Sequence, residues 1–159
     1  MVRIIQSPVG LLSLTAEGSR LVGIGLNAEG EVSTEPATGL LVEVEQQLGA
    51  YFAGRLKVFS LPLQFSGTAF QNEVWTALRE IRFGATCSYA EIAEAIGRPE
   101  AVRAVGAANG QNPIPIVVPC HRVIGKDGSL TGFGGGLAMK SWLLRHETGQ
   151  SRLCEPDYR

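Results

Sequence analysis

The sequence contains little of what disulfide-bonded, metal-binding or membrane-spanning proteins need. Its 159 residues include three cysteines and two histidines and no Cys-x-x-Cys pair, so neither a disulfide framework nor a zinc site is expected. No apolar run reaches the roughly 18 residues of a membrane-spanning helix, and the first residues lack the features of a signal peptide. Free thiols suit a reducing compartment. We therefore expect a cytoplasmic protein that does not associate with a membrane.

The sequence also lacks a large excess of charge of either sign. The net charge is −1, so the broad basic field typical of nucleic-acid-binding proteins is absent. The charges are nevertheless distributed unevenly: four basic and six acidic residues give −2 over residues 1–66, whereas four basic residues and one acidic residue give +3 over 98–126. A local patch of this kind suits phosphate contacts. An ordinary solvated face has the same composition, so charge alone does not decide between them.

The first half is predicted to be β-rich. Short runs of β-forming residues at 2–5, 11–15 and 21–26, separated by turn-like sequences, predict an antiparallel meander. A loop is expected over 27–37, a helix over 40–52 from the spacing of its apolar residues, and a further strand over 57–63. Histidine and cysteine are both absent from residues 1–66. We expect this half to be a structural domain.

Two capping boxes mark helix starts in the second half. Thr68 is followed three residues later by Gln71, and Ser88 by Glu91, which is the pattern that satisfies the first backbone N–H groups of a helix. The second box is expected to open a short helix over 89–96, and a closing amphipathic helix is expected over 137–147. The second half is therefore predicted to be mostly helical.

Residues 89–108 have the pattern of a helix-turn-helix. After Gly97 a second helix is predicted over 99–108, with Pro99 at its first position. An ordinary helical hairpin has the same pattern and is commoner. The second helix favours DNA binding, however, because it is rich in alanine, so that it can approach a groove closely, and it carries one long cation, Arg103.

Cys120 is the candidate nucleophile. A buried cysteine is usually an inert small hydrophobe, which fits Cys87 and Cys154, but Cys120 follows a short predicted strand at 116–118 and directly precedes His121 and Arg122. A free thiol with a pKa of roughly 8.5 needs a base or a positive field to react at neutral pH. Adjacent strand residues point to opposite faces, so His121 would reach the thiol only at a strand end or through a water molecule. Either His146 or Glu147 is a candidate to orient it.

The run Pro-Cys-His-Arg-Val-Ile-Gly at 119–125 resembles the active-site signature of the O6-alkylguanine-DNA alkyltransferases. The resemblance extends in the same order to Ser-Tyr at 88–89 and to the segments 103–106, 112–115 and 135–140. It spans roughly residues 68–148 and is weaker over the first half.

This resemblance implies an α+β fold of two domains. Residues 1–66 would form a small antiparallel β-sheet domain with a helix, ribonuclease H-like, and residues 67–159 a mostly helical domain containing the helix-turn-helix. The implied activity is direct-reversal DNA repair: O6-alkylguanine is flipped out of double-stranded DNA and its alkyl group is transferred once, irreversibly, to Cys120. The partner would be such DNA, bound through the minor groove by a monomer without a cofactor, and O4-alkylthymine is a second candidate substrate.

The resemblance also implies roles for individual residues. Cys120 would attack the alkyl carbon, and His121 would take the thiol proton through a water molecule while Glu147 holds the other nitrogen of the His121 ring. Asn112 would fix the loop. Tyr89 would donate a proton to the base, and Lys140 would polarise Tyr89. The implied substrate pocket comprises Val123, Pro115, Phe133, Gly134 and Gly135. The implied DNA contacts are Arg103, which would enter the duplex where the base had been, with Ala101, Ala104, Ala107 and Arg122.

Two of these positions depart from what some members of the family carry. Phe133 stands where tyrosine is common, and Gly134 stands where some members have a serine whose hydroxyl reaches the O6 region. We expect Gly134 to widen the pocket and to admit bulkier alkyl groups.

Three other functions are alternatives to this interpretation. A damage-recognition module that binds DNA without transfer would not need Cys120. A cysteine hydrolase would use Cys120 and His121 for acyl transfer, but the sequence shows no separate oxyanion-hole motif and the helix-turn-helix would be unexplained. A purely structural protein leaves the Pro-Cys-His-Arg run without a purpose.

Overall fold

The computed structural model describes residues 1–148, so Cys154 and the predicted polar tail lie outside the described residues. The chain divides into two compact units. The first consists of Met1–Phe65 with Pro113–Pro115, and the second of Ser66–Asn112 with the chain from Ile116 onward.

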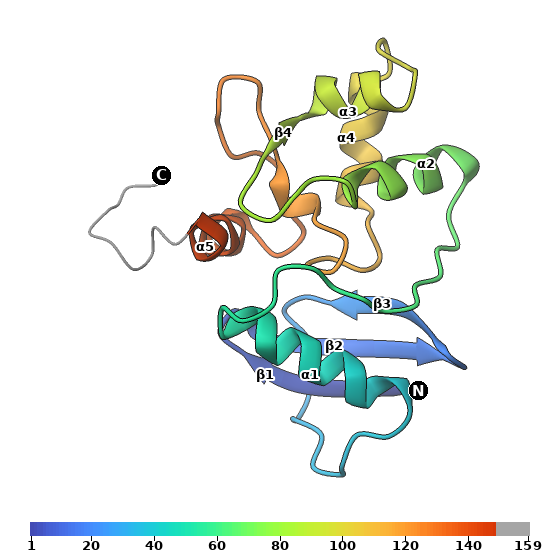
Figure 1. Ribbon diagram of the computed structural model, residues 1–159, viewed down its shortest axis with the longest axis vertical. Helices are drawn as coiled ribbons and strands as arrows, with labels where there is room; N and C mark the ends of the chain where they lie inside the picture. The colour runs from blue at the N-terminus through green and yellow to red at the C-terminus, as the bar shows by residue number, and fades with distance from the viewer. Residues whose placement is uncertain (149–159) are drawn as a thin grey trace. The chain divides into compact units, whose positions relative to one another are not determined.

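The first unit is a three-stranded antiparallel sheet with one helix (Figure 1). β1 (Val2–Ser7), β2 (Gly10–Glu17) and β3 (Arg20–Gly25) pair in sequence order, with one irregularity at Thr15/Ala16. Helix α1 (Leu40–Phe52) runs along one face of the sheet and buries an apolar stripe against it, as its helical spacing predicted. The predicted meander and the helix over 40–52 are confirmed.

The strand predicted over 57–63 is wrong. This segment contributes only an isolated bridge between Leu63 and Leu21. The backbone of Ser60 is instead held by a side chain, because Gln47 on α1 accepts from Ser60 N at 2.9 Å and donates to Ser60 O at 3.4 Å. Since the following proline at position 62 has no N–H to donate, a regular ladder cannot form here.

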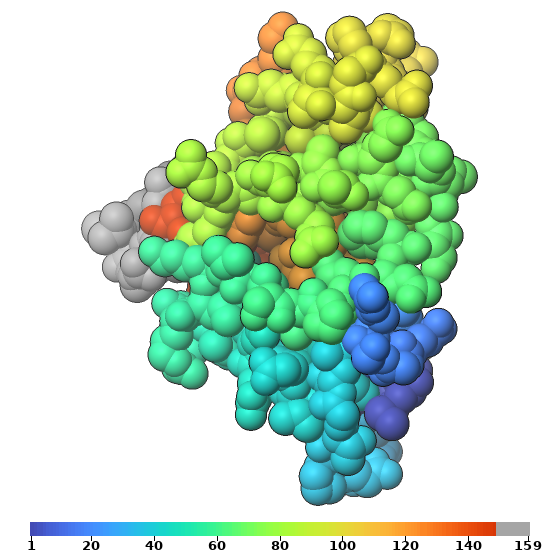
Figure 2. Space-filling model, turned by 45° about the vertical axis from the view of Figure 1, so that its right-hand side comes forward, coloured from blue at the N-terminus to red at the C-terminus, as the bar shows by residue number. Residues whose placement is uncertain are grey.

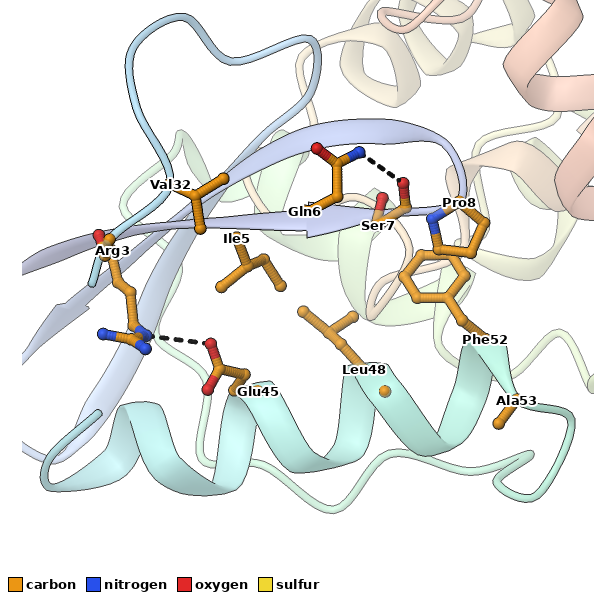
Figure 3. A pocket seen from close by; sticks show the side chains of 12 residues that line it. Arg3, Ile5, Gln6, Ser7, Pro8, Val32, Glu45, Leu48, Phe52 and Ala53 are labelled. Carbon is orange, nitrogen blue, oxygen red and sulfur yellow. Dashed lines mark hydrogen bonds and ion pairs between the residues drawn. The ribbon is translucent and has the colours of Figure 1, made fainter. Parts of the chain in front are cut away.

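A pocket of about 560 Å³ lies beside β1 and α1 (Figure 3). Ile5, Leu48 and Phe52 provide apolar walls, and Arg3 Nε donates to Glu45 Oε2 at 3.0 Å at one end. The described residues that line this pocket include no cysteine and no histidine. It therefore offers neither a thiol nor an imidazole.

The second unit is mostly helical. It contains α2 (Ala69–Leu78), α3 (Tyr89–Ala95), α4 (Val102–Gly110) and α5 (Leu137–Thr148), with a short parallel pair formed by β4 (Cys87–Ser88) and β5 (Val123–Ile124). Both predicted capping boxes are present, at the starts of α2 and α3. α2 and α4 are joined by a buried hydrogen bond from Trp75 Nε1 to the Ala108 carbonyl, at 2.8 Å.

One predicted helix start and one predicted strand in this unit are wrong. Helix α4 begins at Val102 and not at Pro99, because residues 99 and 100 form a turn in which Ala101 N donates to the Arg98 carbonyl. Residues 116–118 do not form a strand. Ile116 takes a φ of 75°, a left-handed conformation that is strained for a β-branched residue, and the chain turns there toward Cys120.

None of the helices described between residues 1 and 148 is both long and apolar enough to cross a membrane.

Candidate active site

Cys120 begins a short 3-10 helix, Cys120–Arg122, and its side chain is buried, with 5% of the residue exposed. Two asparagines hold the chain around it. Asn112 Nδ2 donates to the Val118 carbonyl at 2.8 Å, and Asn109 Nδ2 donates to the Cys120 carbonyl at 3.4 Å. Because the 3-10 turn replaces the predicted strand end, the alternating strand geometry no longer separates Cys120 from His121.

The environment of the thiol has opposing effects on its reactivity. Burial raises the pKa of Cys120, while a hydrogen bond with the Asn112 side chain and the positive charge of Lys140 lower it, and the balance lies above the usual value. Desolvation disfavours the thiolate. Since the thiolate is the nucleophile, Cys120 needs a base close by to react at neutral pH.

His121, Glu147 and Arg122 form a buried cluster. His121 Nε2 lies 2.7 Å from Glu147 Oε2, and Arg122 donates from Nε to Glu147 Oε1 at 2.7 Å and from Nη2 to Oε2 at 3.0 Å. A third bond runs from Arg122 Nη1 to the Ile81 carbonyl at 2.6 Å. Of the two predicted candidates to orient His121, Glu147 does so, and the His146 ring stacks on Trp142.

This cluster corrects the prediction that Arg122 contacts DNA. Only 7% of the Arg122 side chain is exposed, its guanidinium is engaged by Glu147 and Ile81, and it lies over the Phe83 ring. A guanidinium in this position cannot reach a phosphate without breaking a buried ion pair. Arg122 is a framework residue of the site.

The cluster also fixes the protonation of His121. Burial would raise the pKa of Glu147, but hydrogen bonds from His121 and Arg122 hold it well below its usual range, so the carboxylate only accepts. Nε2 must therefore carry the proton of a neutral imidazole, and burial lowers the pKa of His121, which keeps it neutral. Nδ1 is then a basic lone pair, and this buried atom has no hydrogen-bond partner among the described residues.

Lys140 is fully buried on α5. Its Nζ donates to the Val123 and Thr131 carbonyl oxygens, at 2.6 Å each. Burial lowers its pKa to about 8, and the charge of a Cys120 thiolate acts in the opposite direction. Tyr89 at the start of α3 points its hydroxyl at Thr131, 3.0 Å from Oγ1 and 3.3 Å from the carbonyl. Lys140 and Tyr89 thus meet at Thr131.

A cavity of about 520 Å³ opens beside Tyr89. Its lining includes Phe133 and Gly134, two residues of the predicted pocket, and the small residues Gly106 and Gly110 of α4. A Cβ built on Gly134 would meet no atom within 4 Å, so the space beside it is open. Of the remaining predicted pocket residues, Val123 is fully buried, Gly135 is half-buried, and Pro115 belongs to the first unit.

Helices α3 and α4 form the predicted helix-turn-helix, and α4 lies at the surface in the view of Figure 2. Arg103, Ala104 and Ala107 are exposed on α4, and Ala101 at its N-cap is half-buried. These side chains leave the helix surface nearly flat apart from one long cation. That surface suits close approach to a nucleic-acid groove.

Sequence reasoning missed two residues that the structure brings to the site, Asn109 and Thr131. Asn109 is only 2% exposed in the last turn of α4, which is a position for an apolar residue unless the side chain has a buried partner. That misplaced polar residue was the available signal. Thr131 lies in a loop of small residues and gave none.

The second unit combines a helix-turn-helix with a buried thiol that lies beside a histidine–glutamate pair. This combination defines the class of DNA-binding proteins that carry a cysteine nucleophile. Two family models match the chain: 6-O-methylguanine DNA methyltransferase, DNA binding domain, over residues 69–149, and 6-O-methylguanine DNA methyltransferase, ribonuclease-like domain, over 1–65. The chain belongs to the 6-O-methylguanine DNA methyltransferase family.

Individual relatives agree over nearly the whole length. The methylated-DNA–protein-cysteine methyltransferase of Mycobacterium leprae is 48% identical over 152 residues, covering 93% of this chain and 92% of that protein. The constitutive methyltransferase of Bacillus subtilis is 46% identical over 151 residues, covering 89% and 92%. A crystal structure of Mycobacterium tuberculosis OGT in complex with DNA has a TM-score of 0.85 and 49% identity, covering 93% of this chain and 92% of that one.

Proposed function

We propose that this protein repairs O6-alkylguanine in double-stranded DNA by moving the alkyl group onto Cys120 Sγ. The observation that carries the proposal is the buried arrangement of Cys120 next to a neutral His121 whose Nε2 is held by Glu147 at 2.7 Å. This arrangement provides an acceptor thiol together with a base for its proton. Membership of the family supports the choice of substrate.

The proton leaves Cys120 toward His121 Nδ1. Glu147 keeps the Nε2–H tautomer in place, so that Nδ1 is free to accept, and a bridging water is the route we propose between thiol and imidazole. The charge of Lys140 and the hydrogen bond with Asn112 favour the thiolate once the proton has left. Arg122 keeps Glu147 ionised throughout.

The thiolate then displaces guanine from the alkyl carbon. The Sγ–C bond forms as the C–O6 bond breaks, and the electron pair passes to the guanine ring. We propose that Tyr89 gives its hydroxyl proton to a ring nitrogen, so that guanine leaves without a full negative charge. The product is a stable thioether, so each molecule reacts once. None of the proposed steps uses a cofactor.

The damaged carbon lies within the base stack, so the nucleotide must first be flipped out at a cost of a few kcal/mol. We propose that α4 enters the minor groove with its surface of small residues and that Arg103 occupies the space left by the base. Exposure of Arg103, Ala104 and Ala107 on this helix supports this docking. The related Mycobacterium tuberculosis protein has been crystallised in complex with DNA.

All the residues given a chemical role belong to the second unit of a single chain, which supports action as a monomer. Cys87 and Cys120 are both free thiols, and Cys120 must stay reduced to accept an alkyl group. We therefore propose the cytoplasm as the compartment of this protein, because thiols persist in a reducing environment.

The direct test is a mass measurement. The protein is mixed with a double-stranded oligonucleotide containing O6-methylguanine, and the intact mass is followed by mapping of the modified peptide. One methyl group per molecule on Cys120, absent in Cys120→Ser and retained in the matched control Cys87→Ser, is the expected result. Repeated turnover, transfer to another residue or no transfer would overturn the proposal.

A further inference from the structure

Thr131 has no role in the mechanism above, yet it connects two of its parts. It is an exposed residue in the loop between β5 and α5, and it lines the 520 Å³ cavity together with Tyr89. Its carbonyl accepts from Lys140 Nζ at 2.6 Å and from the Tyr89 hydroxyl at 3.3 Å, and its Oγ1 lies 3.0 Å from the same hydroxyl. Thr131 is therefore the point at which the buried cation and the phenol meet.

The two oxygens of Thr131 have different capacities. The carbonyl can only accept, whereas the side-chain hydroxyl can accept and also donate one hydrogen bond. While the cavity is empty of base, Tyr89 can direct its proton to either oxygen. When Tyr89 turns its proton toward a base, the Thr131 hydroxyl can reverse its direction and donate to the Tyr89 oxygen. Lys140 meanwhile holds the Thr131 carbonyl, which fixes the loop that carries this hydroxyl.

We propose that Thr131 is a positioning residue for Tyr89. The Thr131 hydroxyl orients the Tyr89 phenol and donates a hydrogen bond to the phenol oxygen while the phenol gives its proton to the leaving guanine. This inference rests on the proposed function. As the Sγ–C bond forms and the C–O6 bond breaks, the Tyr89 proton moves to a guanine ring nitrogen. Thr131 keeps its own proton throughout and contributes only a hydrogen bond to the charge that develops on the phenol oxygen.

The chain offers a matched pair of substitutions. Thr131→Ser retains the hydroxyl, and Thr131→Val retains the shape and β-branching without it. A neutral hydrogen bond contributes about 0.5–1.5 kcal/mol, so the methyl-transfer rate at saturating duplex should fall about 2- to 12-fold in Thr131→Val. It should stay within about twofold in Thr131→Ser, and the dissociation constant for the unreacted duplex should be unchanged in both. Because the side chain is exposed, the melting temperature should remain that of the unmodified protein.

The decisive measurement repeats Thr131→Val in a Tyr89→Phe background. A residue that acts through the Tyr89 hydroxyl has no further effect once that hydroxyl is gone, so the two variants with Phe at position 89 should react at the same rate. A residue that merely supports the loop would slow transfer equally in both backgrounds, which would overturn the inference. Equal rates for Thr131→Val and Thr131→Ser would overturn it as well. Failure of the unmodified protein to methylate Cys120 would instead overturn the proposed function itself.

Discussion

Replacing Glu147 with glutamine tests the buried cluster most directly. The substitution preserves the shape of the side chain but removes the negative charge that faces Arg122 and that accepts from His121. The Glu147 side chain is only 1% exposed. Leaving one partner of a buried ion pair without its counter-charge costs about 3–5 kcal/mol. The free energy of unfolding of the second unit should fall by that amount at pH 7. Urea unfolding followed by tryptophan fluorescence suits the measurement, because both tryptophans, Trp75 and Trp142, belong to this unit.

The first unit supplies a matched control. Glu45 accepts from Arg3 Nε at 3.0 Å, but its side chain is 36% exposed, so Glu45→Gln should cost no more than about 1 kcal/mol. If the glutamine at position 147 prevents folding, the double variant Arg122→Met/Glu147→Gln removes both charges and should be more stable than Glu147→Gln alone. A loss below about 1 kcal/mol in Glu147→Gln would refute the buried ion pair as the stabilising element.

Acidification gives the same cluster an independent signature. The pKa of Glu147 is depressed in the folded protein by its bonds with His121 and Arg122, so the unfolded state takes up this proton first as the pH falls. The stabilisation is therefore complete above the ordinary glutamate pKa of about 4.3 and is lost below it, by up to about 1.4 kcal/mol per pH unit. Glu147→Gln should lack this component, whereas Glu45→Gln should retain it. Equal slopes between pH 4.3 and 3 in the unmodified protein and Glu147→Gln would refute the assignment.

Four further outcomes are expected. Ser88→Ala removes the side-chain acceptor of the α3 capping box and should lower the unfolding free energy by about 1 kcal/mol in urea titrations. Arg103→Ala should slow transfer from a duplex about tenfold or more, because flipping then lacks its inserted side chain, while leaving transfer from the free base O6-benzylguanine unchanged in a single-turnover assay. Gly134→Ser should slow transfer of benzyl relative to methyl by filling open space; an unchanged ratio would contradict the wider pocket. Methylated Cys120 should show a lower melting temperature by calorimetry, since an added methyl group in a packed site costs about 1–3 kcal/mol.

The features that could be predicted from sequence are those fixed by neighbouring residues. A capping box forms within four consecutive residues. Thr68 with Gln71 and Ser88 with Glu91 therefore predicted the starts of α2 and α3 correctly. The meander and α1 were predictable for the same reason, because apolar periodicity and turn residues act over short distances. The motif around Cys120 also predicted the thiol and the histidine to which we assign the chemistry, and these roles stay predictions.

The failures occur where distant parts of the chain decide the outcome. The segment 57–63 has the composition of a strand, but the Gln47 side chain occupies the Ser60 backbone and prevents a ladder. Arg122 lies in a basic stretch and is of a residue type that often contacts DNA. It is instead buried in an ion pair with Glu147, which lies 25 residues further along the chain. The neighbouring residues do not predict the left-handed backbone of Ile116, whose side chain is fully buried.

The cluster behind Cys120 has an energetic cost that packing alone does not explain. His121, Arg122, Lys140 and Glu147 are all buried in one unit, and apolar residues of similar volume would often stabilise a fold as well or better. Their order gives the explanation. Arg122 keeps Glu147 ionised, the ionised carboxylate fixes the proton of His121 on Nε2, and the imidazole is thereby left with a basic Nδ1. Each group thus sets the state of the next, and in the mechanism proposed above the His121 imidazole is the base for a thiol whose own burial disfavours its ionisation.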